Sequence, residues 1–262
     1  SEPTAPSRPA AQVRAARVVA MDRLAPDVMR VKLEPEGGRI AFYAGQYLNV
    51  LLEDGQKRSF SFATPPHEGG PIELHVRLIP GGKFTTHVFE SMKVGDVVRF
   101  EGPVGSFFLR ESGDKPIIFV AGATGFAPVK SMVEHALHAG LRREMVLYWG
   151  TRRLSDMYLR ELPERWAREH ANFRFVPVLS EPAAGDGWTG RTGLVHEAIL
   201  ADYPDLAGHQ IYACGSVKMV EAAHPAFTSH GLTPDDCFSD AFRLAPRIDS
   251  READLVRLGG RP

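Results

Sequence analysis

The feature that most constrains the fold is a change of pattern at the polar stretch 111–114, which divides the chain into two halves. Before it, from Val13 onward, short runs alternate apolar and polar residues and are separated by Gly- and Pro-containing turns, a pattern typical of antiparallel strands. After it, apolar runs alternate with amphipathic helices, as in a parallel sheet covered on both faces. The chain is therefore predicted to form two domains of different fold class.

The first half is expected to form a small antiparallel barrel or sandwich, because many short strands follow one another at close spacing. The clearest alternating runs are residues 28–33, 47–51, 72–78 and 97–100. One short helix, over about residues 84–92, follows Gly81 and Gly82.

The second half is expected to be an α/β domain with a parallel sheet. Strands are predicted at residues 116–121, 145–150, 173–179 and 210–214, and helices at 127–139, within 158–170, near 194–201 and within 217–229. Pro128 stands where the first turn of a helix tolerates proline, and Gly140 where a helix commonly ends. These patterns predict a barrel domain over residues 13–111 and an α/β domain over 112–242. Residues 1–12 are expected to be a disordered tail or linker, and 243–262 a C-terminal tail.

Composition excludes several classes of partner. The net charge of −1 provides no overall field for nucleic acid or an anionic membrane, and no run approaches the ~18 apolar residues of a membrane span. Two cysteines, Cys214 and Cys237, cannot supply the four thiolates of a plant-type iron–sulfur cluster and do not have a zinc spacing. One disulfide is formally possible, but two thiols in a reducing cytoplasm are the preferred interpretation. No metal site is expected, and His135 and His138 are interpreted as surface residues.

The stretch 55–63 combines a fixed cation, hydroxyls and aromatic rings. Arg58 can pair with phosphate through its planar guanidinium. On a strand, Ser59 and Ser61 would lie on one side and Phe60 and Phe62 on the other. Such a set could hold a diphosphate, a hydroxylated chain and a flat heterocycle together. The alternative is an ordinary sheet edge.

The stretch 122–128 has the strand–turn–helix context of a dinucleotide site. Small residues permit a tight turn, and the following helix would direct its first N–H groups at an anion. The pattern is not GxGxxG, so a plain tight connection remains the alternative.

Two further candidates lie at the carboxyl ends of predicted parallel strands, where ligands bind in such sheets. Cys214 could lie against a reactive ring, or it could be a small buried thiol. Arg152 and Arg153 could meet an adenosine phosphate, or they could belong to a solvated charged cluster.

Taken together and in order, these segments resemble the ferredoxin–NADP reductase superfamily, in its branch of flavin reductases and oxygenase reductases. The motifs that carry the resemblance are 58–61 (RSFS), 102–107 (GPVGSF), 124–128 (TGFAP), 148–150 (YWG), 214–216 (CGS) and 240–242 (DAF). Residues 75–89 and 100–110 are similar to the reductases of the CDP-6-deoxyhexulose dehydrase pathway.

The resemblance implies an FAD-binding barrel followed by a nicotinamide-binding α/β domain. It implies that Ser61, near flavin N5, and Cys214, near the reacting nicotinamide carbon, are the catalytic residues. The cofactor-binding residues that it implies are Arg58, Ser59, Phe60, Ser61, His75, Val76, Arg77, Gly82, Lys83, Phe84, Thr85, Thr124, Gly125, Pro128, Arg152, Cys214, Gly215 and Phe242. Of these, Arg58 would pair with the FAD diphosphate, and Phe242 would shield the flavin.

Three departures from the family pattern matter. Phe60 replaces a frequent Tyr and removes one hydroxyl contact. Ala123 replaces a usual Gly, so the turn there must tolerate a Cβ atom. The similar reductases carry an N-terminal 2Fe–2S ferredoxin domain that this sequence lacks, which leaves open whether that domain is naturally absent or precedes the first residue.

The resemblance predicts an NAD(P)H-dependent flavoprotein reductase that passes electrons to a ferredoxin, an oxygenase, a dehydrase or a small-molecule acceptor. NADH is the expected donor, because Glu181 stands where NADP-selective relatives place a phosphate-binding Arg and would repel the extra phosphate. Arg152, Arg153 or Arg191 could reverse that preference. The alternatives are a free-flavin reductase, which releases FAD or FMN, and a non-catalytic nucleotide-binding subunit.

Overall fold

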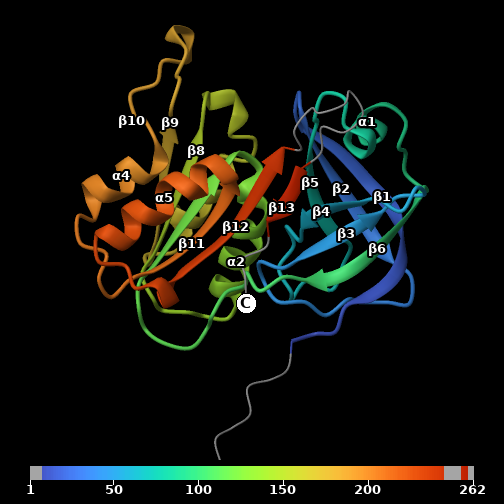
Figure 1. Ribbon diagram of the computed structural model, residues 1–262, viewed down its shortest axis with the longest axis horizontal. Coiled ribbons are helices and arrows are strands. Elements are labelled where there is room, and N and C mark those ends of the chain that lie inside the picture. Colours follow the sequence, from blue (N-terminus) through green and yellow to red (C-terminus); the bar gives the residue numbers. More distant parts are fainter. Residues whose placement is uncertain (1–7, 245–254, 259–262) are drawn as a thin grey trace, which may run out of the picture.

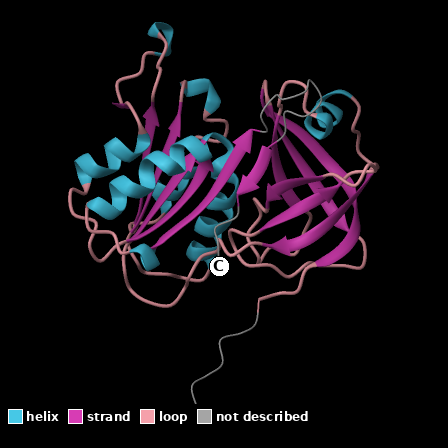
Figure 2. Ribbon diagram, viewed as in Figure 1, coloured by secondary structure: helices cyan, strands magenta, loops and turns pink. Residues whose placement is uncertain are grey.

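The alternating runs of the first half form one antiparallel sheet in the computed structural model, which describes residues 8–244 and 255–258. The strands are β1 (Gln12–Ala25), β2 (Val28–Pro35), β3 (Tyr47–Leu51), β4 (Lys57–Ser61), β5 (Ile72–Arg77) and β6 (Val97–Val104), and their order is β4-β3-β6-β1-β2-β5. The Ala63 N–H, just beyond β4, donates to the Glu73 carbonyl on β5 at 2.9 Å. This bond brings the two edges together, so the sheet curls into a barrel (Figure 2).

The interior of the barrel is filled by the apolar residues of each alternating strand. Leu48, Phe62 and Phe100 are completely buried there. Helix α1 (Lys83–Glu90) packs Phe84 and Val88 onto the same core. The helix ends two residues earlier than expected because Ser91 has a non-helical φ of −132°, so the Met92 N–H donates to the His87 carbonyl in place of that of Val88.

The second half forms a sheet in the order β10-β9-β8-β7-β11-β12-β13. Its strands are β7 (Ile117–Gly122), β8 (Met145–Thr151), β9 (Phe173–Leu179), β10 (Arg191–Thr192), β11 (Gln210–Ser216), β12 (Cys237–Leu244) and β13 (Leu255–Leu258). Strands β7 to β12 run parallel, and β13 pairs antiparallel with β12. The long helices are α2 (Phe126–His138), α3 (Glu161–Glu169), α4 (Val195–Asp202) and α5 (Val217–Ser229). The 3-10 turns are η1 (Ala123–Gly125), η2 (Leu154–Asp156), η3 (Ala184–Asp186) and η4 (Pro234–Asp236).

Helices cover both faces of this sheet (Figure 1). Val195, Ala223 and their neighbours on α4 and α5 pack on one face. On the other face, α2 and α3 share a core with Phe107 and other residues from the first half. The face that carries α2 is therefore the face that meets the barrel.

The predicted fold class is confirmed, an antiparallel barrel followed by a parallel α/β domain. The predicted tails overlap with regular structure, because Gln12 belongs to β1, β12 extends to Leu244, and Leu255–Leu258 forms β13. Residues 8–11 are described and have no regular secondary structure, whereas residues 1–7, 245–254 and 259–262 lie outside the described residues. Within the described part of the chain, every helix is too short or too polar to span a bilayer.

Candidate active site

Strand β4 positions the residues of the first candidate half-site. It pairs with β3 so that Ser59 lies opposite Asn49, and the Ser59 hydroxyl donates to Asn49 Oδ1 at 2.6 Å. The Arg58 guanidinium is buried and held in place, since it donates to the Lys57 carbonyl at 2.9 Å and to Gln56 Oε1 at 2.6 Å. Two fixed hydrogen bonds orient a cation of the planar kind that binds phosphate.

The amino end of α1 lies beside β4. Lys83 forms an ion pair with Asp54 in the β3–β4 turn, and its hydrogen bond lowers the pKa of that carboxyl. The rings of Phe84 and Phe60 lie 5.5 Å apart. The first N–H groups of a helix lack intrahelical acceptors, and no side chain caps those of α1 at Gly82. Arg58 and an uncapped helix end thus form one anion-attracting region, which fits a diphosphate.

Phe60, Phe62, Ser61 and Thr85 lie in the same region of the barrel. Phe60 and Phe62 both belong to the barrel core, as the expected alternation requires, and Ser61 is buried at the end of β4. The Thr85 hydroxyl is occupied by the backbone, because it accepts from the Ile79 N–H at 3.1 Å. Its backbone N–H remains in the first turn of α1.

The second half-site is the turn from β7 through η1 into α2. A Cβ atom at Gly125 would lie 2.0 Å from the Cys214 carbonyl oxygen, so only glycine permits the turn to approach β11 so closely. Ala123 has a φ of 48° and is the single non-glycine residue with positive φ among the described residues. Its carbonyl accepts from Trp149 Nε1 at 3.0 Å. The Cβ atom is tolerated at Ala123 in a left-handed conformation that favours glycine.

The amino end of α2 fits an anion as α1 does. Its first turn has no acidic residue and no side-chain cap, and Pro128 lies in that turn as predicted. Thr124 is half-buried within η1. Gly215, at the end of β11, packs against Met219, whose Cε would lie 2.5 Å from an added Cβ.

Cys214 lies on β11 between Ala121 of β7 and Asp240 of β12. Its side chain is completely buried in the core on the α2 face, the face that meets the barrel. Cys214 and Cys237 are both free, which confirms two thiols and no disulfide between them. Burial raises the pKa of the Cys237 thiol to about 11.

The remaining predicted residues of the second half lie at strand ends. The Glu181 N–H donates to the Arg152 carbonyl at 2.9 Å, and both side chains are exposed beyond β8 and β9. Arg191 is engaged elsewhere, with an ion pair to Asp202 at 2.8 Å. On β12, the backbone of Phe242 lies opposite Ser216 of β11, but the Phe242 side chain is outside the described residues.

The side chains of the three predicted β5 residues, His75, Val76 and Arg77, lie in three different environments. Val76 is buried in the barrel core, and Arg77 lies at the surface 3.5 Å from Asp27. The His75 ring is fully buried at the domain interface, where Nδ1 lies 2.8 Å from Tyr158 Oη and Nε2 lies 2.6 Å from Glu73 Oε2.

Helix α2 brings the two half-sites together. Lys130 Nζ donates to the Ala63 carbonyl at 3.2 Å, and Ser131 Oγ donates to the Thr64 carbonyl at 2.8 Å. Ala63 and Thr64 directly follow the β4 motif, whereas α2 directly follows Thr124 and Gly125. The residues that follow β4 therefore contact the second turn of α2 across the domain interface, and β5 contacts η1 beside them.

Sequence reasoning did not identify Glu73, Lys130 or Tyr158 as site residues. Glu73 and His75 alternate with Leu74 and Val76 on β5, a pattern that indicates a solvent-facing side. The second domain covers that side, which strand periodicity cannot reveal.

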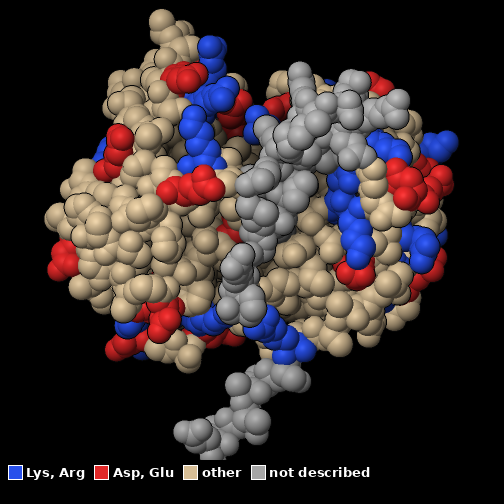
Figure 3. All heavy atoms as spheres, viewed as in Figure 1, with Lys and Arg blue, Asp and Glu red and all other residues tan. Residues whose placement is uncertain are grey.

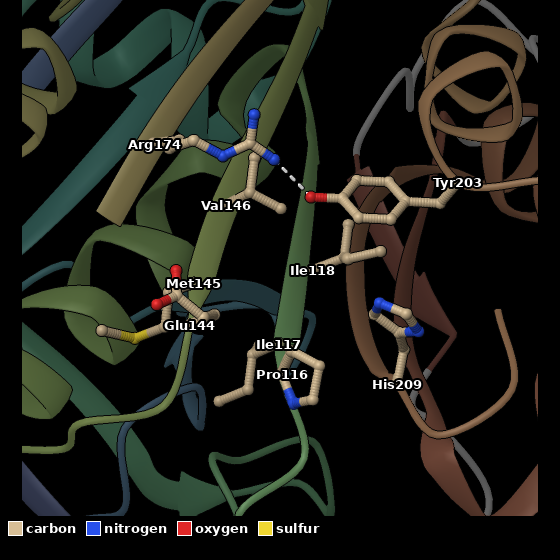
Figure 4. Close-up of a pocket in the computed structure, with 9 residues that line it drawn as sticks. All are labelled: Pro116, Ile117, Ile118, Glu144, Met145, Val146, Arg174, Tyr203 and His209. Carbon is tan, nitrogen blue, oxygen red and sulfur yellow. Dashed lines mark hydrogen bonds between the residues drawn. The ribbon is translucent and has the colours of Figure 1, made fainter. Parts of the chain in front are cut away.

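The pocket in Figure 4 belongs to a different end of the sheet. Its lining residues are Pro116, Ile117, Ile118, Glu144, Met145, Val146, Arg174, Tyr203 and His209. Pro116, Ile117 and Met145 lie at the amino ends of β7 and β8, whereas the candidate site lies beyond their carboxyl ends. Ligands of open α/β sheets bind at the carboxyl ends.

Two family models match successive parts of the chain. Residues 15–109 match the family model of the oxidoreductase FAD-binding domain, and residues 119–225 match that of the oxidoreductase NAD-binding domain. The chain is 44% identical over 217 residues to a CDP-6-deoxy-L-threo-D-glycero-4-hexulose-3-dehydrase reductase of Yersinia pestis, a match covering 82% of this chain and 64% of that relative. The chain thus spans less than two thirds of the length of that relative.

Two further comparisons cover more of the matched protein. An NAD(P)H-flavin reductase of Aliivibrio fischeri is 36% identical over 233 residues, which is 86% of this chain and 97% of that reductase. The crystal structure of the Amycolatopsis cytochrome P450 reductase GcoB is similar with a TM-score of 0.82 and 34% identity, covering 89% of this chain and 70% of that one.

Proposed function

Since the chain belongs to the ferredoxin–NADP reductase superfamily, in its branch of flavin reductases and oxygenase reductases, we propose that it is an NAD(P)H-dependent flavoprotein reductase. The barrel, residues 13–111, holds FAD, and the α/β domain, residues 112–242, holds the nicotinamide dinucleotide. The observation that carries this proposal is the pair of bonds from Lys130 and Ser131 to the Ala63 and Thr64 carbonyls. They hold the residues that follow β4 against α2, the helix that begins directly after η1.

The barrel residues act by binding and orientation. Arg58 and the first turn of α1 hold the FAD diphosphate, and Phe60, Ser59 and Ser61 line the flavin and its ribityl chain. β5 contributes through the backbone of His75, Val76 and Arg77, because their side chains are engaged elsewhere. Gly82, Lys83, Phe84 and Thr85 complete the region at the start of α1. The basic side chains of Arg58 and Lys83 provide positive charge for an anionic cofactor. Figure 3 also shows Lys and Arg side chains on both sides of the junction between the halves.

The α/β residues present the donor. Thr124, Gly125 and Pro128 bind the dinucleotide at the amino end of α2, while Cys214 and Gly215 lie beneath the nicotinamide. When bound, the flavin itself supplies the chemistry, by accepting a hydride from the nicotinamide. Orientation by the protein contributes up to about 7–11 kcal/mol of barrier reduction in well-positioned cases.

NADH is the proposed donor. Glu181 follows β9 and its side chain is exposed, while its backbone N–H is bonded to the Arg152 carbonyl. Its carboxylate disfavours the additional phosphate of NADPH by charge repulsion. Arg191 does not offset this repulsion, because its guanidinium is paired with Asp202. Arg152 remains available at the surface for the phosphate groups common to both donors.

The proposed acceptor is a partner protein of the oxygenase, dehydrase or ferredoxin class. The Yersinia relative is named as the reductase of a dehydrase. A second relative, from Comamonas sp., is named as reductase component 1 of terephthalate 1,2-dioxygenase and is 36% identical over 234 residues. The names of these two relatives give different partners, a dehydrase and a dioxygenase.

A free-flavin reductase is the second candidate, because the Aliivibrio NAD(P)H-flavin reductase matches over 97% of its own length. Gel filtration of the FAD-loaded chain separates the two candidates. A flavoprotein remains yellow after desalting, whereas a free-flavin reductase becomes colourless and still reduces added FAD or FMN.

The proposal is tested by NADH oxidation with a dye as electron acceptor, with and without FAD. FAD-dependent dye reduction supports the proposal. Binding of FAD without any dye reduction would instead support a non-catalytic nucleotide-binding subunit.

A further inference from the structure

We propose that the buried network of Glu73, His75, Tyr158 and Lys130 is the positioning device that fixes the η1 turn relative to β4. This inference rests on the proposed function, because it assigns these residues to the alignment of the two nucleotide half-sites. They are positioning residues, since each acts through the backbone or through another side chain.

The first link runs from the barrel to the loop before α3. Tyr158 Oη lies 2.8 Å from His75 Nδ1, and His75 Nε2 lies 2.6 Å from Glu73 Oε2. Burial raises the pKa of Tyr158 and lowers that of His75, so the phenol is protonated and the imidazole is neutral. Tyr158 therefore donates to Nδ1, and the Nε2–H donates to Glu73. All three side chains have a fixed role as donor or acceptor.

The second link runs from Tyr158 to the η1 turn. Its ring packs edge-on against Trp149 with centroids 5.4 Å apart, and against Phe126 at 6.1 Å. Trp149 in turn holds the Ala123 carbonyl through its indole N–H, and Phe126 is the first residue of α2. The barrel thus reaches the turn through His75, Tyr158 and Trp149.

The third link runs back from α2 to the barrel. Lys130 Nζ lies 3.5 Å from Glu73 Oε2 and 2.7 Å from Glu134 Oε1, and it also donates to the Ala63 carbonyl two residues after Ser61. The Lys130 side chain is only 10% exposed. Arg30 on β2 adds a weaker positive charge near Glu73 and His75. The network is therefore closed, because Glu73 joins the His75–Tyr158 link to the Lys130–Ala63 link.

A polar network suits positioning better than an apolar contact would. Apolar surfaces attract without direction and tolerate sliding, whereas buried hydrogen bonds lose free energy as soon as the donor and acceptor move apart. Because the network is buried, water cannot replace a stretched bond easily. The consequence is one preferred placement of η1 against β4.

The test uses the full chain with Tyr158→Phe, which removes one hydroxyl, and Lys130→Met, which removes the ammonium group. The matched control is Tyr148→Phe, because Tyr148 is also buried and donates to Asp202 at 2.6 Å within the α/β domain. Without any cofactor, amide hydrogen exchange is measured for residues 122–126. With FAD bound, the limiting rate of flavin reduction and the Kd of NADH are measured under anaerobic stopped-flow conditions.

We expect faster exchange in residues 122–126 for Tyr158→Phe and Lys130→Met but not for Tyr148→Phe. The limiting rate of flavin reduction should fall about 10- to 100-fold in the two network variants, with flavin content and the NADH Kd nearly unchanged. Wild-type exchange and wild-type reduction rates in both network variants would overturn the inference, as would an equal loss in Tyr148→Phe. Failure of the wild-type protein to bind or reduce flavin would instead refute the proposed function. The hydrogen-exchange data, which need no cofactor, would still test whether the network positions η1.

Discussion

Gly125 and Cys214 are in direct backbone contact, since a Cβ atom at Gly125 would lie 2.0 Å from the Cys214 carbonyl oxygen. The opposing atoms belong to the β11 backbone and cannot rotate away. Gly125→Ala is therefore expected to push the η1 turn away from β11 and to destabilise the fold by about 3 kcal/mol, near the upper end for overpacked sites. Thermal unfolding should show a Tm lower by several degrees, and NADH binding should weaken in the folded fraction.

Gly185→Ala is the control for that substitution. Gly185 lies in the same domain and has an ordinary φ, and a Cβ atom added there would meet nothing within 4 Å. Its Tm and NADH affinity should remain at wild-type values. Equal effects of the two substitutions would show that the contact with Cys214 is unimportant.

Ala123→Gly should stabilise the protein. The φ of 48° at Ala123 places an L-residue in the left-handed region, which costs roughly 1–2 kcal/mol for a residue with a Cβ atom. Glycine removes that cost but loses more backbone entropy on folding, roughly 0.5–1 kcal/mol. We expect a net gain of about 0.5–1 kcal/mol in the free energy of unfolding.

The opposite sign is expected at Ala184, which begins another 3-10 turn with negative φ. Ala184→Gly should lower the free energy of unfolding, because glycine there loses backbone entropy on folding without relieving strain. Urea unfolding of both variants measures the two changes. A decrease in stability for Ala123→Gly would contradict the strain at η1.

The pKa of Glu73 predicts a specific loss of stability in acid. Burial alone would raise this pKa, but the hydrogen bond from His75 and the charge of Lys130 lower it from 4.5 to about 2. The unfolded state therefore binds the proton more readily, so this contribution is present above pH 4.5 and disappears as the pH falls toward 2. At 1.36 kcal/mol per pKa unit, this shift corresponds to about 3 kcal/mol of folding stability.

Urea unfolding of the wild type and Glu73→Gln between pH 7 and pH 2 tests this prediction. The variant should be less stable by about 3 kcal/mol at pH 7, and the two curves should converge toward pH 2. His75 adds a second slope in both proteins, because burial lowers its pKa and the unfolded state takes up that proton below about pH 6.5. A constant difference at every pH would show that Glu73 is not held as a carboxylate.

Glu181 is expected to set the choice of donor. Glu181→Gln removes the negative charge of this exposed side chain without changing its shape. The kcat/KM for NADPH should rise about tenfold, which corresponds to about 1.4 kcal/mol, while that for NADH should change little. Steady-state turnover with each donor measures the ratio, and Glu169→Gln, an exposed glutamate on α3, is the control. A wild-type protein that strongly prefers NADPH would refute the role of Glu181.

The fold was predictable because its two halves have different periodicities. The predicted strands at 47–51 and 173–179 coincide with Tyr47–Leu51 and Phe173–Leu179, since each is a short apolar or alternating run bounded by turn residues. The β12 extension and β13 were not predicted. β13 pairs antiparallel with β12 and also contacts β4 of the barrel, and local sequence does not reveal such pairings between distant segments.

The site was predictable only in part. Motif order placed Arg58, Thr124 and Cys214 on the correct elements, because turns and strand ends have local sequence signals. The contact between the two half-sites depends on how one domain covers the other, and no local pattern encodes that packing. For this reason Tyr158, a loop residue outside every motif, was not predicted to contact His75.

The absorption spectrum of the FAD-loaded protein before and after anaerobic addition of NADH tests the central proposal most directly. The proposal predicts an oxidised-flavin absorption band whose intensity corresponds to about one FAD per chain. This band should bleach when NADH is added, because the nicotinamide reaches the flavin across the domain interface. A protein that takes up no flavin, or whose bound flavin remains oxidised with excess NADH and NADPH, would contradict it.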